Sequence, residues 1–387
     1  MKIVFCSNFM NHHQLYISEA LIGLGVEYTF VATTETPVER KKLGYRDMNR
    51  EYSWVVRAYE SEEQEKIAKK LIKEADLVIS GSAPMRYLRG RILKNKPVFL
   101  YSERWFKSAD GDVSKFKTLH NWLSNLLHRK YFNCFNVYML CASAYTAHDC
   151  NIYGNFKGKC YKWGYFPYVV EYDIAKLLEQ KGQNEKVKLL WVGRFLDWKH
   201  PEYPIAVAKR LKAKGIKFEL NMIGIGEELE KINNAIVEEN LQDCVHLLGS
   251  MPTEKVREYM EKSNIFLFTS DFNEGWGAVL NESMNSACAV VANHGIGAAP
   301  FLIQDKMNGV LYNNGDIDEF CNEVEQLVND RKTCEKMGQA AYNTIVEEWN
   351  PDNAARKLLK LYNIIFENSG ETIENGVCSK AEILANS

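Results

Sequence analysis

Two glutamates, Glu274 and Glu282, bracket the stretch EGWGAVLNE. Paired carboxylates could act as the acid and base of a glycoside hydrolase, or they could bind the hydroxyl groups of a ligand. An apolar run with strand character precedes the stretch, and Gly275 and Gly277 let the chain turn into a helix. We expect the backbone amides of Gly275, Trp276 and Gly277 to point out beside Glu274 at this helix start. Since one glutamate lies on a turn and the other in a helix, the pattern favours binding of a hydroxyl-rich or anionic ligand.

Two cations follow an earlier apolar run, in the stretch GRFLDWKHP. Gly193 allows close backbone approach, and Arg194 and Lys199 come shortly before a helix that opens at Pro201. Cations near a helix N-terminus are suited to binding a diphosphate. Gly224 marks another strand-to-helix turn in MIGIGEE, although its spacing does not match a dinucleotide-binding fingerprint.

Polar side chains in the first half could add chemistry. His12 and His13 follow the run KIVFCS, and histidine can transfer protons or contact phosphate near neutral pH. Glu103 follows the run PVFLYS. Ligands of open α/β sheets bind at the carboxyl ends of strands, so these side chains could reach a ligand. A capping or packing role for the stretch NHHQ stays open.

The elements that would position these residues alternate along the chain. Short β-branched runs are separated by helical patterns, at 2–7, 27–33, 75–81, 97–102 and 137–143, and again at 187–193, 217–224, 244–250, 264–270 and 289–293. This order predicts parallel sheets covered on both faces. We expect an N-terminal domain over 1–175 and a C-terminal domain over 176–350. A helix over 352–366 would pack back on the first domain, and 368–387 would form a polar, frayed tail.

Composition fits a soluble enzyme of two domains. The 387 residues are 46% hydrophobic and 25% charged. Ten cysteines are scattered without a CxxC pair, which argues against a zinc site and fits a reduced compartment. The N-terminus lacks the features of a signal peptide, and no apolar run approaches the ~18–20 residues of a membrane span. We therefore expect a cytoplasmic protein.

The charge is uneven although the formal net charge is only −2. Lys and Arg exceed Asp and Glu in residues 1–180, and the reverse holds in residues 181–387. A basic first half could meet a phosphate-bearing acceptor or an anionic membrane surface. Within residues 103–136, apolar side chains fall on one helical stripe with basic flanks, which predicts either a core-facing helix or a membrane-contacting surface.

Together, the stretches GRFLDWKHP, MIGIGEE, VHLLGSMPTEKV and EGWGAVLNESMNSACAVVANHGIG resemble the C-terminal domain of the retaining family 4 glycosyltransferases, over roughly residues 187–350. This resemblance implies the GT-B fold, an α/β architecture of two Rossmann-like doubly wound parallel-sheet domains facing across a cleft. The opening CSNFMNHHQ resembles sugar transferases of bacterial surface-polysaccharide pathways.

The resemblance also implies roles for individual residues. In the family, the first glutamate of the pair contacts hydroxyls of the donor sugar and the second holds the ribose; here these are Glu274 and Glu282. The Arg and Lys that bind the diphosphate are here Arg194 and Lys199, and they would offset charge on the leaving group. Amides near Gly297 would add donors. Members generally need no bound metal, so we expect no metal and no cofactor.

The predicted activity is retaining transfer of a hexose or N-acetylhexosamine from a nucleoside-diphosphate sugar, with UDP favoured, to a glycan or lipid-linked saccharide acceptor. Nucleic acid is not an expected partner. Two alternatives stay open: a sugar-nucleotide epimerase or phosphorylase of the same fold, and a non-catalytic sugar-nucleotide-binding subunit. The sequence departs from the family at Cys288, where a glycine is usual, and at Ala299 and Pro300, where an acidic residue is missing. These departures leave the donor sugar open.

Overall fold

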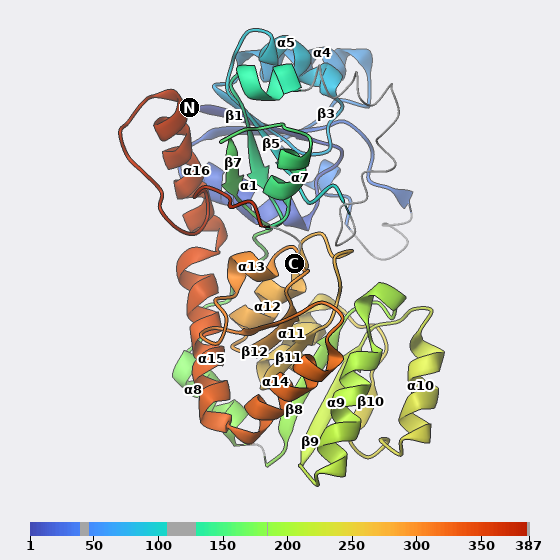
Figure 1. Ribbon diagram of the computed structural model, residues 1–387. Helices are drawn as coiled ribbons and strands as arrows, with labels where there is room; N and C mark the ends of the chain where they lie inside the picture. Colours follow the sequence, from blue (N-terminus) through green and yellow to red (C-terminus); the bar gives the residue numbers. More distant parts are fainter. Residues whose placement is uncertain (39–45, 107–128, 184, 385–387) are drawn as a thin grey trace. The chain divides into compact units, whose positions relative to one another are not determined.

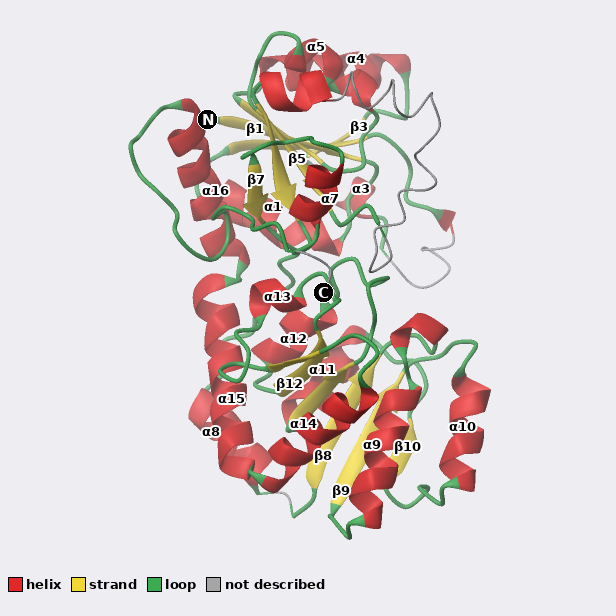
Figure 2. Cartoon of the chain, viewed as in Figure 1, coloured by secondary structure: helices red, strands yellow, loops and turns green. Residues whose placement is uncertain are grey.

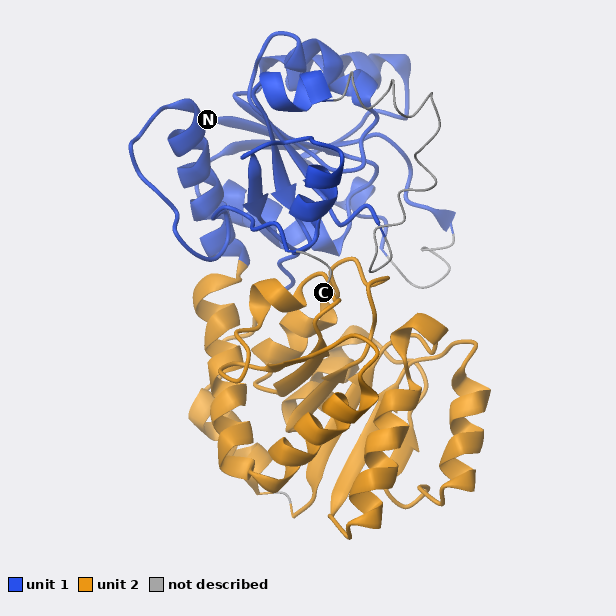
Figure 3. Ribbon diagram, in the orientation of Figure 1, with its two compact units in different colours: residues 1–106, 110–168, 351–387 blue, residues 107–109, 169–350 orange. Residues whose placement is uncertain are grey.

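The computed structural model describes residues 1–38, 46–106, 129–183 and 185–384. The described residues up to Tyr168, together with those from Pro351 onward, form one compact unit, and Val169–Asn350 form the second (Figure 3). The sequence placed this division between residues 175 and 176. It falls earlier because Tyr172 packs into the second unit, where its hydroxyl donates to Glu261 and its amide donates to the hydroxyl of Tyr342.

The first unit contains a seven-stranded parallel sheet in the order β3-β2-β1-β4-β5-β6-β7 (Figure 1). Its strands are β1 Lys2–Ser7, β2 Glu27–Ala32, β3 Val55–Arg57, β4 Leu77–Ser80, β5 Val98–Ser102, β6 Val137–Cys141 and β7 Cys160–Lys162. Its helices are α1 His12–Gly23, α3 Met48–Glu51, α4 Glu62–Glu74, η1 Met85–Tyr87, α5 Arg89–Ile92, α7 Thr146–Ile152 and α16 Pro351–Phe366.

The second unit contains a six-stranded parallel sheet in the order β10-β9-β8-β11-β12-β13. Its strands are β8 Val187–Val192, β9 Phe218–Ile223, β10 Val245–Leu247, β11 Ile265–Phe268, β12 Ala289–Asn293 and β13 Val310–Tyr312. Its helices are α8 Ile174–Gly182, η3 Asp197–Lys199, α9 Glu202–Ala213, α10 Leu229–Glu238, α11 Thr253–Lys262, α12 Val279–Asn285, α13 Ala299–Leu302, α14 Ile317–Asn329, α15 Arg331–Asn343 and the π-helical turn η4 Thr344–Glu348.

Both sheets are doubly wound, which confirms the predicted α/β class. The strand order reverses next to β1 in the first sheet and next to β8 in the second, with β4 and β11 on the other side of each reversal. Figure 2 shows helices on both sides of each sheet. In such sheets ligands bind outside the carboxyl ends of the strands at the reversal. The fold therefore directs attention to the segments that follow β1, β4, β8 and β11.

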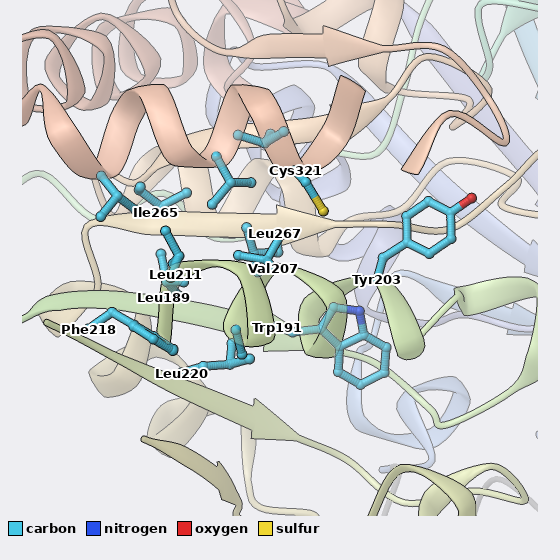
Figure 4. Close-up of a cluster of buried hydrophobic side chains, with 14 of the residues drawn as sticks. Leu189, Trp191, Tyr203, Val207, Leu211, Phe218, Leu220, Ile265, Leu267 and Cys321 are labelled. Atoms are coloured by element: carbon cyan, nitrogen blue, oxygen red, sulfur yellow. The ribbon is translucent and has the colours of Figure 1, made fainter. Parts of the chain in front are cut away.

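A continuous apolar core holds the second sheet between its helices (Figure 4). All four residues of β11 are buried, as expected for a strand that is covered on both faces. Leu189 of β8 and Leu220 of β9 meet Leu211 of α9 in this core. Each fully buried side chain of this size contributes about 1.5–3 kcal/mol relative to an exposed one. The strand ends at the candidate site thus extend from a tightly packed scaffold.

Residues 351–384 belong to the first unit. Helix α16 packs on α1, and the ring of Phe366 lies 5.5 Å from that of Tyr138. The expectation of a frayed tail is wrong for the segment that follows: Val377 and Cys378 are buried, and Cys378 donates its amide to the carbonyl of Lys162 at 2.8 Å. The reason is that β7 is an edge strand, whose unpaired backbone groups the tail satisfies.

The predicted amphipathic stripe within 103–136 falls mostly on residues 107–128, which lie outside the described residues. Its core-facing and membrane-contacting alternatives therefore stay predictions. Among the helices that the structure describes, none combines the length and apolar character needed to cross a bilayer.

Candidate functional site

The loops after β8 and β9 lie against each other because glycine occupies the contact points. A Cβ atom at Gly224, where φ is +143°, would lie 1.8 Å from the carbonyl oxygen of Gly193. A Cβ atom at Gly226 would lie 2.3 Å from the carbonyl oxygen of Phe195. In return, Phe195 donates its amide to the carbonyl of Ile225 at 2.9 Å. The stretch MIGIGEE therefore supports the loop that carries Arg194, which is itself exposed.

A hydrogen-bonded chain positions Lys199 at the end of β11. The indole nitrogen of Trp191 donates to the hydroxyl of Thr269 at 2.9 Å, and this hydroxyl donates to the carbonyl of Lys199 at 2.6 Å. The Lys199 ammonium contacts the carboxylate of Glu274 and lies 4.5 Å from the ring centroid of Trp198. Both charged side chains of this ion pair are only 14% exposed. The pair therefore lies in a shielded setting where charge interactions are stronger than in water.

His200 ties the same two loops together. Its Nδ1 lies 2.9 Å from a carboxylate oxygen of Glu202, and its Nε2 lies 3.7 Å from one of Asp271. The carboxylates of Asp271 and Glu202 raise the pKa of His200 to about 9, so the imidazole is protonated at neutral pH. Asp271 also donates its amide to the carbonyl of Trp198 at 3.0 Å. Sequence reasoning gave no role to His200, which lies inside GRFLDWKHP, or to Asp271, which lies three residues before EGWGAVLNE.

The glycine turn around Glu274 is fixed by its own backbone. The amide of Glu274 donates to the carbonyl of Asp271 at 3.0 Å, and the amide of Gly297 donates to the carbonyl of Glu274 at 3.3 Å. At Gly277, φ is +87° and a Cβ atom would lie 2.6 Å from the ring of Phe268. The Gly297 N–H thus stabilises the turn, and a donor role for the amides near Gly297 stays a prediction.

The sequence suggested a role for the backbone amide of Trp276 and none for its side chain, which lies in the core. Its side chain is 1% exposed, and its indole nitrogen donates to Asn281 at 2.9 Å. The rings of Phe301 and Trp349 lie 6.4 Å and 6.1 Å from it. The indole is thus a core group that anchors the turn to α12. Since the whole residue is buried, the expected role of the Trp276 amide as a ligand donor stays a prediction.

Glu282 lies in the first turn of α12, where the helix dipole favours a carboxylate. Burial raises the pKa of its carboxyl, and the positive charge of Arg257 opposes this shift. Arg257 donates to the side chain of Asn285 at 2.9 Å, and Asn285 in turn bonds both backbone groups of Val170. These contacts hold the helix that presents Glu282.

In the second unit, the structure brings some of the predicted residues together. Lys199 and Glu274 are in contact, and Gly193 abuts Gly224. Arg194 lies on the same loop as Lys199, and its side chain is exposed. This group follows the carboxyl ends of β8, β9 and β11 and contains cations, carboxylates and a helix start. It can bind hydroxyl groups and phosphate oxygens. Within the described ranges, no cluster of His, Cys, Asp and Glu has the arrangement of a metal site.

Glu103 and His12 belong to the first unit, which has a pocket of about 660 Å³ at the carboxyl ends of β1, β4 and β5. Glu103 lines this pocket, and so does His13, whereas His12 packs against His13 with ring centroids 3.9 Å apart. Both histidines open α1, which Asn11 caps through a hydrogen bond to the His13 amide at 2.9 Å. The capping role left open for this stretch thus falls to Asn11.

Buried contacts fix the loop that carries Glu103. The amides of Trp105 and Phe106 both donate to one carboxylate oxygen of Asp149, at 2.6 Å and 3.1 Å. Asp149 is fully buried; burial raises the pKa of its carboxyl, while these amides and Arg104 oppose the shift. The carboxylate of Glu103 accepts a hydrogen bond from the hydroxyl of Tyr165. Sequence reasoning missed Asp149 and Tyr165, because their roles depend on contacts distant in the chain.

Comparisons with known proteins bear on both units. Residues 173–344 match the family model described as glycosyl transferases group 1. The amylovoran biosynthesis glycosyltransferase AmsK of Erwinia amylovora is 28% identical over 183 residues, which cover 46% of this chain and 45% of that protein. The poly(ribitol-phosphate) alpha-N-acetylglucosaminyltransferase of Staphylococcus aureus is 29% identical over 182 residues, covering 47% and 36% of the two chains. The chain thus spans less than half the length of these two curated relatives.

A solved structure resembles nearly the whole chain. The crystal structure of Alr3699/HepE from Anabaena in complex with UDP superposes with a TM-score of 0.67 at 14% identity. The match covers 94% of this chain and 100% of that one. At this identity the likeness is one of fold, and it extends over both sheets.

Proposed function

Because residues 173–344 form a domain of the group 1 glycosyl transferase family within a chain of the GT-B fold, we propose that this protein is a retaining, metal-independent glycosyltransferase. It would move a hexose or N-acetylhexosamine from a nucleoside-diphosphate sugar to a glycan or lipid-linked saccharide. The retaining outcome and the lack of a metal requirement are carried over from the resemblance to family 4.

The observation that carries the proposal is the shielded ion pair of Lys199 and Glu274 beside the loop of Arg194. A diphosphate bound there would have cations on one side, and its sugar would lie near the Glu274 carboxylate. Glu282, in the first turn of α12, would bind the ribose hydroxyls. Lys199 and Arg194 would offset the charge that develops on the leaving diphosphate as the sugar–phosphate bond breaks.

UDP is the donor nucleotide we favour. The structure of Alr3699/HepE, which shares the fold, was solved with UDP, and this supports a uridine donor without fixing the sugar. The relatives from Erwinia and Staphylococcus are named for a polysaccharide pathway and a poly(ribitol-phosphate) acceptor, which supports a glycan or polymeric acceptor here. We further propose a cytoplasmic location. Contact of the segment 103–136 with the inner membrane face is one of two predictions for that segment, beside a core-facing helix.

A nucleotide titration tests the donor assignment. Isothermal titration of the intact chain with UDP, GDP and ADP should give one-to-one binding of UDP in preference to the others. Glu282→Ala should weaken UDP binding by roughly tenfold or more, because it removes a carboxylate acceptor for the ribose hydroxyls. As a matched control, Glu239→Ala removes a carboxylate on the surface that pairs with Lys209. Equal UDP affinity in Glu282→Ala and wild type would contradict the ribose assignment.

Transfer assays separate the two alternatives. An epimerase would convert one sugar nucleotide into another without releasing UDP. A non-catalytic subunit would bind UDP-sugars and leave them intact. Release of UDP with transfer of the sugar to water or to an acceptor would exclude both.

A further inference from the structure

The pocket of the first unit combines aromatic rings with a fixed carboxylate. The ring of Tyr165 stacks on that of His13, with centroids 4.2 Å apart and planes 18° from parallel. The edge of Tyr101 meets Tyr165, with ring centroids 6.0 Å apart. All three residues line the pocket with Glu103, which accepts the Tyr165 hydrogen bond.

Two sets of contacts fix the position of Glu103. The buried Asp149 carboxylate accepts the amides of Trp105 and Phe106, so the backbone next to Glu103 is anchored. The Tyr165 hydroxyl holds the carboxylate itself, and the stack on His13 restrains the Tyr165 ring. A carboxylate anchored at both ends can accept hydrogen bonds in a defined direction, which lowers the entropy lost when a ligand binds.

The charges around the pocket favour a neutral ligand. Among its described lining residues, the one side chain with a permanent positive charge is Arg104. Arg104 is 3% exposed, lies 4.7 Å from the ring centroid of Tyr145, and interacts with the Asp149 carboxylate. A phosphate in this pocket would meet the Glu103 carboxylate, and the nearby Asp149 carboxylate already offsets part of the Arg104 charge. A neutral ring bearing hydroxyls would instead donate to Glu103 and pack its C–H face on an aromatic ring.

We propose that this pocket binds a neutral, hydroxyl-bearing saccharide end of the acceptor, that Glu103 accepts hydrogen bonds from its hydroxyls, and that Tyr165 is a positioning residue that fixes Glu103. Its volume of about 660 Å³ is adequate for one or two sugar rings. Any phosphate of a lipid-linked acceptor would then lie outside the pocket. The identification of this saccharide as the acceptor rests on the proposed function, whereas its binding can be measured without a donor.

The test measures saccharide binding to the intact chain by saturation-transfer NMR. The neutral probes are maltose, cellobiose, lactose and di-N-acetylchitobiose, and the charged probes are glucose 1-phosphate and glucose 6-phosphate. At least one neutral probe should bind the wild type. Glu103→Gln should weaken its binding roughly 10- to 100-fold, and Tyr165→Phe roughly 3- to 10-fold. Tyr168→Phe is the matched control, because Tyr168 is 60% exposed and does not line the pocket.

The double variant separates positioning from a general structural role. If Tyr165 acts through Glu103, adding Tyr165→Phe to Glu103→Gln should weaken binding no further. Additive losses would show that Tyr165 acts by another route and would overturn its assignment. The thermal midpoint of each variant is recorded, and if Tyr165→Phe lowers it strongly, Glu103→Gln alone decides the pocket assignment.

Three results would overturn the proposal: no neutral probe binds the wild type, the neutral probe binds Glu103→Gln as well as wild type, or a phosphorylated probe binds more tightly than every neutral one. UDP titrations of the same samples distinguish this failure from that of the proposed function. UDP binding without saccharide binding contradicts only the pocket assignment. Saccharide binding without UDP binding contradicts the donor assignment and leaves the pocket assignment standing.

Discussion

Replacing Gly224 by alanine tests whether the contact between the β8 and β9 loops shapes the proposed nucleotide site. A Cβ atom at this position would lie 1.8 Å from the carbonyl oxygen of Gly193. Nonbonded carbon and oxygen atoms need about 3 Å or more, so the loop that carries Arg194 must move by roughly 1 Å. The backbone angle φ of +143° adds strain of about 1–3 kcal/mol for any residue with a side chain.

A matched variant separates the effect of displacing the Arg194 loop from the effect of backbone strain at the substituted glycine. Gly215 also has a positive φ, of +68°, but a Cβ atom there would meet nothing within 4 Å. Gly215→Ala should therefore lower the thermal midpoint through backbone strain alone. Gly224→Ala should lower it further and should also misplace Arg194.

The expected outcome is a selective loss of ligand binding. A 1 Å displacement of a positioning loop can cost on the order of 100-fold in activity, so we expect UDP binding in Gly224→Ala to fall by roughly 10- to 100-fold. Gly215→Ala should stay within about threefold of wild type, since ordinary surface changes cost about 0.5 kcal/mol. Isothermal titration with UDP measures both. Wild-type UDP affinity in a folded Gly224→Ala protein would refute the claim that this contact shapes the site.

Three further predictions concern charged groups of the second unit. Lys199→Ala and Arg194→Ala should each lower the rate of UDP release from a UDP-sugar by on the order of 100-fold or more. The control Lys209→Ala, at an exposed ion pair, should leave this rate unchanged. Wild-type rates in both site variants would contradict the diphosphate assignment. The folded-state pKa of His200, about 9, lies above its ordinary 6.5, so its stabilisation is full below pH 6.5 and is lost as pH rises through about 9. The stabilisation by protonated His200 amounts to at most about 3 kcal/mol, and solvent screening reduces it further. Thermal midpoints measured from pH 6 to 10 should show its decline in the wild type but not in His200→Gln. The buried Lys181 ammonium donates to three backbone carbonyls, so Lys181→Met should destabilise the protein by about 2–4 kcal/mol in urea unfolding, and a loss below about 1 kcal/mol would show that those carbonyls find other donors.

The fold was largely predictable because buried parallel strands leave a strong signal. The run NIFLFTS has the apolar centre IFLF, and the structure places β11 there. The short strands β3, β7 and β13 were not predicted, since each has only three residues. The equally short β10 was predicted because it lies within the longer run CVHLLGS. The packed tail was also missed, because its pairing depends on the free edge of β7 rather than on the local sequence.

The positions of the candidate donor-site residues were predictable because they follow strands, whereas their roles stay a proposal. Arg194, Lys199 and Glu274 lie on loops after strands, as the alternating pattern required. The supporting contacts were not predictable, because Thr269 reaches Lys199 and His200 approaches Asp271 across about 70 residues of sequence. Sequence alone could not tell whether such polar groups face solvent or one another.

Proton NMR of the intact chain with UDP-glucose and UDP-N-acetylglucosamine tests the central claim most directly. Water serves as a slow acceptor, so no glycan needs to be identified in advance. We predict that UDP is released from at least one of these donors and that the free sugar appears first as the α-anomer. Donors that stay intact, donors converted only into epimers, or a sugar released first as the β-anomer would contradict a retaining glycosyltransferase.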